Sequence, residues 1–166
     1  SYFGAHGTAC AGLVGAREPR KTSQTGPIPY FGVNPFCNIR SYATPYSHEF
    51  LPIIRALVEV LLSDVQVVLM PRGVPNMASL REFARKSGHT TRINTNRNES
   101  YLHPFDQAQY EKLARQQGIL EELLKLTAKK CFLVLAAGND GLQEKFSYPA
   151  EALKDDPNVF IIGARN

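Results

Sequence analysis

A histidine among small residues, close to the start of the sequence, is the first candidate for chemistry. His6 lies in the segment 4–12, Gly-Ala-His-Gly-Thr-Ala-Cys-Ala-Gly, and the small apolar residues that follow it predict a buried helix over residues 6–16. The amino end of a helix carries a partial positive charge, which favours a neutral imidazole able to accept a proton. An isolated histidine, however, is more often a capping or core residue.

A second candidate segment follows the most apolar run of the chain. Residues 131–137 predict a buried strand, and it ends at Gly138-Asn139-Asp140-Gly141. Open α/β sheets bind ligands at the carboxyl ends of their strands, where the Asn139 amide could donate hydrogen bonds to an oxyanion. Alternatively, Asn-Asp-Gly is only turn chemistry, with Asn139 or Gly141 in a positive-φ conformation.

The elements that must position these residues alternate between helices and strands. Apolar residues at helical spacing predict a helix over residues 50–62, and short β-branched runs predict strands at 65–70 and 158–162. We also expect a short strand at 38–44, loops at 17–35 and 89–103, a helix at 76–88, and two helices from Pro104 onward that Gly118 separates. This alternation predicts an α/β fold with a mainly parallel sheet.

Composition excludes several classes of protein. The 166 residues are 43% hydrophobic and carry a net charge of +4, as expected for one globular domain. The basic residues are scattered among acidic ones, so we expect no nucleic-acid partner. The longest apolar run is far shorter than the roughly 20 residues that span a bilayer, so we expect no membrane partner. Cys10, Cys37 and Cys131 have no metal-ligand spacing, and each is expected to be a buried free thiol.

Taken together and in this order, the two candidate segments resemble motifs of the subtilisin-like serine peptidases, the subtilases of peptidase family S8. The family's histidine motif, His-Gly-Thr followed by two variable residues and Ala-Gly, matches residues 6–12 at every fixed position. Gly-Val-Asn-Pro at 32–35 is similar to the family's Gly-Val-Ala-Pro turn. Residues 136–141 resemble the oxyanion segment, and 148–150 with 158–164 resemble the Tyr-Pro-Ala segment and the strand that follows it.

The resemblance implies a peptide-bond hydrolase that works through a Ser-His-Asp triad. His6 would be the general base, and the Asn139 side chain would stabilise the oxyanion. The remaining site residues implied by the resemblance would form the substrate groove: Ala136, Ala137, Gly138 and Asp140 around the pocket before the scissile bond, and Met70, Arg72 and Gly73 in the strand segment that pairs with the substrate.

Three departures from the family pattern qualify these expectations. No acidic residue precedes His6, and no Gly-Thr-Ser segment follows Asn139, so these 166 residues alone are expected to be inactive. Pro71 has no N–H to offer a bound peptide, which places substrate preference in doubt. Residues 76–117 have no counterpart in the family's minimal core and are expected to form a helical insertion.

We therefore expect an incomplete three-layer α/β/α subtilase catalytic domain over residues 1–166, cut from a longer chain. The alternative is a catalytically dead relative that serves as a peptide-binding or scaffold module. A nucleotide-binding domain is disfavoured because neither a Gly-x-Gly-x-x-Gly nor a Gly-Lys-Ser/Thr phosphate loop is present.

Cofactors, partners and location follow from the same resemblance. The chemistry needs no metal or organic cofactor, and Glu18 is the only acidic residue in 17–35, too few ligands for a structural calcium site there. The expected partner is a peptide or protein substrate. An extracellular or secreted location is implied by the family alone.

Overall fold

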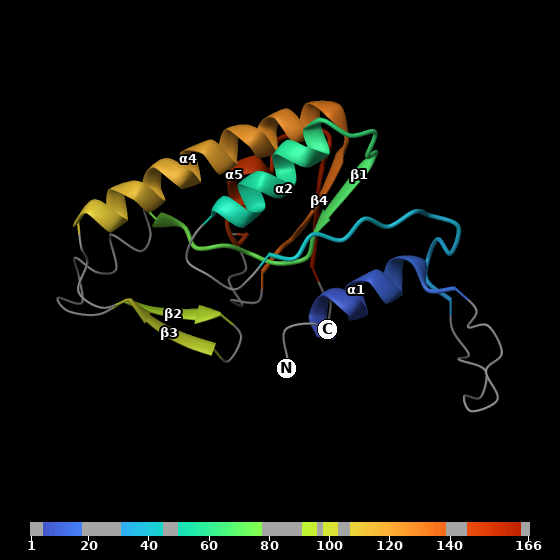
Figure 1. Cartoon of the computed structure of the whole chain (residues 1–166), viewed down its shortest axis with the longest axis horizontal. Helices are drawn as coiled ribbons and strands as arrows, with labels where there is room; N and C mark the ends of the chain where they lie inside the picture. Colours follow the sequence, from blue (N-terminus) through green and yellow to red (C-terminus); the bar gives the residue numbers. More distant parts are fainter. Residues whose placement is uncertain are drawn as a thin grey trace. The chain divides into compact units, whose positions relative to one another are not determined.

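The computed structural model describes residues 5–17, 31–44, 50–77, 91–95, 98–102, 107–138 and 146–163 (Figure 1). The chain divides into two compact units, Ser1–Pro45 and Tyr46–Asn166. Within the described residues, no helix is both long enough and apolar enough to cross a membrane.

The first unit contains α1 (Ala5–Gly15) and the segment 31–44. This segment packs on the end of the helix, because the Val33 and Asn34 N–H groups donate to Leu13 O at 2.9 Å and Val14 O at 2.8 Å. Gly32 is required at this contact, since a Cβ there would collide with the backbone of Gly15.

Two expectations for the first unit are wrong. Helix α1 forms at the predicted position but is not buried: residues 6–9 are exposed, as is Leu13 at 62%. Residues 38–44 are described and form no strand.

The second unit is built on a parallel three-stranded sheet in the order β1-β4-β5. Its elements are α2 (Leu51–Leu61), β1 (Val67–Met70), β2 (Thr91–Thr95), β3 (Asn98–Leu102), α4 (Gln107–Lys130), β4 (Phe132–Ala136), α5 (Ala150–Leu153) and β5 (Val159–Ile162). In the register of this sheet, Met70 of β1 pairs with Leu135 of β4, and Ala136 of β4 pairs with Ile162 of β5. The predicted helix over 50–62 and the predicted strands at 65–70, 131–137 and 158–162 are thus confirmed, with bounds shifted by one or two residues.

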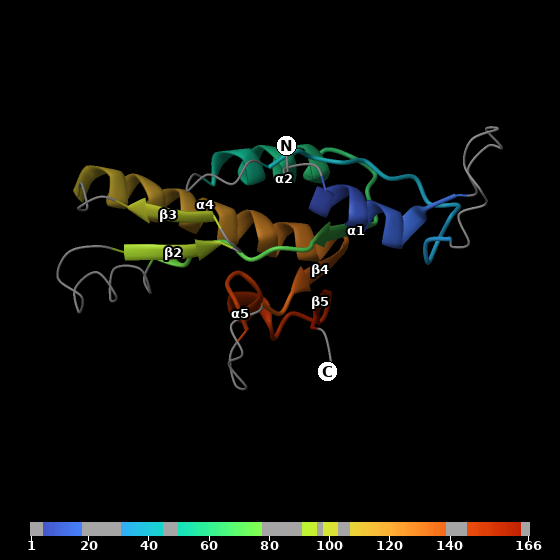
Figure 2. The same ribbon diagram turned by 90° about the horizontal axis from the view of Figure 1, so that it is seen from below.

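The core lies between one face of this sheet and the helices. Helices α2 and α4 run side by side along it (Figure 1), and the view from below places α5 close to β4 and β5 (Figure 2). The largest fully buried side chains include Phe50, Leu120, Leu124, Leu133 and Leu135. At roughly 25 cal/mol per Å² of apolar surface, such burial stabilises the packing of helices on sheet.

The opposite face of the sheet is exposed, so the strand that was predicted to be buried at 131–137 is buried on one face only. Val67, Leu69, Phe132 and Phe160 are between 43% and 55% exposed. The Phe132 and Phe160 rings meet edge to face with centroids 5.6 Å apart. The described residues therefore form an α/β layer pair, in which helices cover one side of the parallel sheet.

The segment between β1 and β4 differs from the predictions in two places. Strands β2 and β3 pair antiparallel where a polar loop was expected, because the Thr, Ile and Tyr residues in them favour extended backbone. Helix α4 continues through Gly118, since Leu113, Leu120 and Leu124 bury one uninterrupted side and outweigh the roughly 1 kcal/mol that glycine costs. The helix predicted at 76–88 lies almost wholly outside the described residues, and the 76–117 insertion stays a prediction.

Candidate active site

The carboxyl ends of β1 and β4 lie side by side, and a third segment joins the residues that follow them. The Ser147 N–H donates to Ala137 O at 2.8 Å, and the Val74 N–H donates to Tyr148 O at 2.9 Å. The Ala137 N–H donates in turn to Ile162 O, also at 2.9 Å, which ties this edge to β5. Residues 70–74, 136–138 and 146–148 therefore form one surface at the sheet edge where ligands of open α/β sheets bind.

Gly138 has the conformation and the space that only glycine allows. Its φ is +106°, a region that L side chains rarely adopt. A Cβ at this position would also collide with Oγ of Ser147. The backbone is therefore in a left-handed conformation two residues after the end of β4, just before the chain continues to Asn139.

The predicted groove residues occupy this edge in different ways. Ala136 and Ala137 are half-buried and Gly138 is exposed. Arg72 is half-buried, and a Cβ on Gly73 would lie 3.3 Å from Tyr148 O. The Met70 side chain, in contrast, is buried in the core at 9% exposure, so only its backbone could meet a substrate.

Ser147 and Tyr148 belong to this edge, although the sequence analysis assigned them no site role. Tyr148 is 7% exposed, and burial, followed by the negative charge of Glu121, raises the pKa of its hydroxyl above the ordinary value. The peptide bond between Tyr148 and Pro149 is cis. The Tyr-Pro-Ala segment at 148–150 was the signal in the sequence that could have placed both residues here.

His6 lies in the first turn of α1, in the other unit, and its side chain is exposed. Its Nε2 atom lies 3.7 Å from Sγ of Cys10, one helical turn further on.

Cys10 is half-buried rather than buried, as is Cys37, and all three cysteines are free thiols. Asn139 and Asp140 lie outside the described residues.

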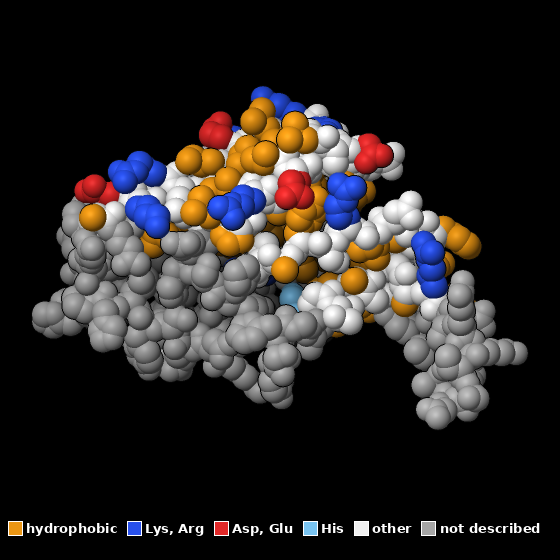
Figure 3. Space-filling view, viewed as in Figure 1, with side chains coloured by type: hydrophobic (Ala, Val, Ile, Leu, Met, Phe, Trp, Pro, Cys, Tyr) orange, Lys and Arg blue, Asp and Glu red, His pale blue; other side chains and the backbone are white. Residues whose placement is uncertain are grey.

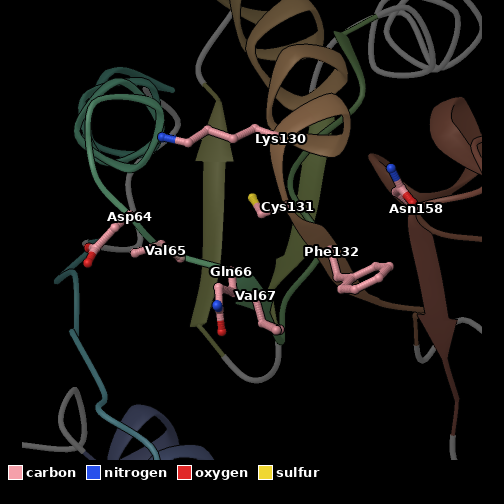
Figure 4. Close-up of a pocket in the computed structure, with 8 residues that line it drawn as sticks. All are labelled: Asp64, Val65, Gln66, Val67, Lys130, Cys131, Phe132 and Asn158. Carbon is pink, nitrogen blue, oxygen red and sulfur yellow. The ribbon is translucent and has the colours of Figure 1, made fainter.

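A pocket of about 640 Å³ lies at the opposite, amino-terminal end of the sheet (Figure 4). Two of its polar side chains, those of Lys130 and Asn158, donate hydrogen bonds to the ends of helices. Lys130 reaches α2 and donates to Leu61 O at 2.7 Å and to Val60 O at 3.3 Å, while Asn158 Nδ2 donates to Ala128 O at 2.8 Å. The buried Cys131 thiol donates to Thr127 O at 3.3 Å, and burial raises its pKa. This pocket is therefore built from helix caps, away from the edge that carries the predicted site.

Among the described residues, no group of three or more His, Cys, Asp or Glu side chains could hold a metal ion.

The fold and this edge define an α/β protein with its candidate site at the carboxyl end of a parallel sheet. The model of the subtilase family, peptidase S8, matches residues 1–166, so the chain belongs to the subtilase family. No curated protein and no solved structure matches it.

Proposed function

We propose that this chain supplies the histidine and oxyanion segments of a subtilisin-type serine endopeptidase. The observation that carries the proposal is the match of the subtilase family over residues 1–166. The exposed position of His6 in the first turn of α1 supports it, because a general base must be accessible to substrate and nucleophile.

In this function His6 takes the proton of a serine hydroxyl as the serine attacks the peptide carbonyl. It then returns that proton to the leaving amine. The Asn139 amide donates to the oxyanion of the tetrahedral intermediate, directly after the left-handed backbone conformation at Gly138. This function requires that a serine and an aspartate from residues outside these 166 complete the triad.

The groove for substrate lies along residues 70–74 and 136–138. Pro71 has no N–H, so fewer backbone donors are available to an extended peptide here. The resemblance to the family implies that Asp140 would lie at the rim of the pocket, where its charge would favour basic or polar side chains before the scissile bond.

The test is fluorophosphonate labelling of the longest protein that the coding sequence around this segment specifies. We expect labelling in the parent and its loss in His6→Ala. Asn139→Gly should keep folding and lower turnover by roughly 10²- to 10³-fold, the known cost of removing one oxyanion-hole donor in subtilisin. His89→Ala is the matched control, because His89 lies outside the histidine motif.

A second candidate function is peptide binding without catalysis. These 166 residues contain neither an acidic residue before His6 nor a Gly-Thr-Ser segment, and this candidate supposes that the longer protein lacks at least one of the two groups as well. A longer protein that still lacks either group, and that takes up no fluorophosphonate, would favour this candidate over the endopeptidase.

A further inference from the structure

The outer side of α4 carries a shallow hollow that the proposed function does not use. It measures about 530 Å³ and is lined by Arg115, Gly118, Ile119, Glu122 and Leu123. These residues follow helical spacing along one exposed stripe, on which Ile119 is 52% exposed. Figure 3 shows exposed hydrophobic side chains between charged ones over the surface of α2 and α4.

Gly118 forms the floor of this hollow, and the packing of its own chain does not require it. No atom of the described part of the chain lies within 4 Å of the position that a Cβ would take. Glycine inside a helix costs about 1 kcal/mol relative to alanine. A small residue at such a position lets a second helix approach closely.

The stripe is complementary to itself about a two-fold axis that passes between residues 118 and 119. In an antiparallel pair of α4 helices, Ile119 of one copy faces the Gly118 hollow of the other. The same axis brings Arg115 of each copy opposite Glu122 of the other, so the interface contains two such pairs. Glu122 Oε1 already pairs with Lys125 at 2.8 Å, which leaves Oε2 for an arginine across the interface.

We propose that this hollow is the docking site of a second copy of the chain, so that two α4 helices cross antiparallel at Gly118 and Ile119. An isologous contact of this kind is self-complementary in shape and charge. Its centre is a small apolar patch with a rim of two exposed ion pairs, which defines a weak, salt-sensitive dimer. This inference is independent of the proposed catalytic function.

Sedimentation equilibrium of the 166-residue chain, from micromolar to millimolar concentration, tests the proposal. We expect a monomer–dimer equilibrium that weakens with added salt. Arg115→Glu and Glu122→Arg should each lower the association constant about tenfold or more, because each variant puts like charges opposite each other at two positions. The double variant should restore association. Arg55→Glu makes the same charge change at an exposed position of α2, outside the hollow, and should leave the association constant unchanged.

Gly118→Ala provides a second test, in which the melting temperature of the monomer and the association constant should change in opposite directions. It should raise the melting temperature of the monomer by about 3 °C through helix propensity, and it should lower the association constant several-fold by filling the hollow. A monomer at all concentrations would overturn the proposal. So would a dimer that Arg115→Glu leaves intact, single variants that the double variant does not rescue, or a dimer that Gly118→Ala does not weaken.

Discussion

Gly138 connects the end of β4 to the segment that carries Asn139, and two constraints act on it together. Its φ of +106° disfavours any other residue, and Ser147 occupies the space where a side chain would begin. Both constraints come from the folded chain, since a sequence alone does not reveal which residue of Gly-Asn-Asp-Gly takes the positive φ. The turn was predictable from residue types, whereas the contact with Ser147 was not, because it joins residues nine positions apart through the edge of the sheet.

Replacing Gly138 by alanine should lower the free energy of unfolding by about 2 to 4 kcal/mol, from backbone strain plus overpacking. Urea denaturation measures this loss. Gly73→Ala is the control, since the nearest atoms to its Cβ lie at 3.3 and 3.4 Å and ask for only a small shift. Equal losses in the two variants would contradict the constraint at Gly138.

The buried hydroxyl of Tyr148 should make the free energy of unfolding depend on pH in the alkaline range. Burial raises the pKa of its hydroxyl above the ordinary value of 10.0, and burial likewise raises the pKa of the Cys131 thiol above 9.0. The folded chain therefore favours the protonated forms. Their contribution to stability is complete below pH 9 and is lost as the pH rises through the range where the unfolded chain ionises.

We expect the free energy of unfolding to fall above pH 9, first through Cys131 and then, above pH 10, by about 1.4 kcal/mol per pH unit through Tyr148. Urea denaturation at pH 7 to 11.5 measures the slope. Tyr148→Phe should remove the second part, and Cys131→Ala the first. A Tyr148→Phe variant whose stability falls in parallel with the parent above pH 10 would show that the hydroxyl is not buried.

At the scale of elements, the sequence predicts best where local pattern and burial agree. Helical spacing from Phe50 to Leu62 gives α2 because Ile53, Leu57 and Val60 all face the core. It predicts less well where distant packing decides. Gly118 is a helix breaker by local rules, yet α4 continues through it because its buried side packs on α2 and the sheet.

Lys130 joins two elements that are far apart in the sequence. Its ammonium group donates to the carbonyl oxygens of Val60, Leu61 and Ser63, at the end of α2. The Val60 oxygen also accepts hydrogen bonds from the Ser63 N–H at 3.1 Å and the Ser63 hydroxyl at 2.8 Å. Carbonyls at this end of a helix carry its partial negative charge, which favours the lysine ammonium group. No local pattern predicts this cap, because nearly 70 residues separate the donor from its acceptors.

Lys130→Met keeps the aliphatic stem and removes the charge, so it should destabilise the chain by roughly 1 to 2 kcal/mol. Lys129→Met is the matched control, since Lys129 is the exposed neighbour on the same helical turn. Thermal or urea unfolding should therefore distinguish the two variants. Similar losses in both would mean that the cap contributes nothing measurable.

At the scale of the whole molecule, the exposed face of the sheet marks the limit of prediction from composition. The apolar runs of β1 and β4 predict strands covered on both sides, as parallel sheets usually are. In the unit Tyr46–Asn166 the described helices cover one side only, and Val67, Leu69, Phe132 and Phe160 stay exposed on the other. An exposed apolar patch of this kind is available to bind apolar groups.

This face should bind the dye 8-anilinonaphthalene-1-sulfonate in the folded state. The double variant Phe132→Thr/Phe160→Thr should lower the dye fluorescence by about half or more, and threonine preserves the preference for a strand. The free energy of unfolding should fall by roughly 1 to 2 kcal/mol, because the two half-buried rings lose part of their burial and their edge-to-face contact.

Leu135→Ala tests the opposite face of the same sheet. Leu135 is 1% exposed, so its truncation should cost roughly 2 to 5 kcal/mol through a cavity in the core. If the Phe132→Thr/Phe160→Thr variant lost as much free energy of unfolding as Leu135→Ala and its dye binding were unchanged, both faces of the sheet would be packed. Substitutions on the exposed face should therefore change dye binding more than stability, and substitutions on the buried face should change mainly stability.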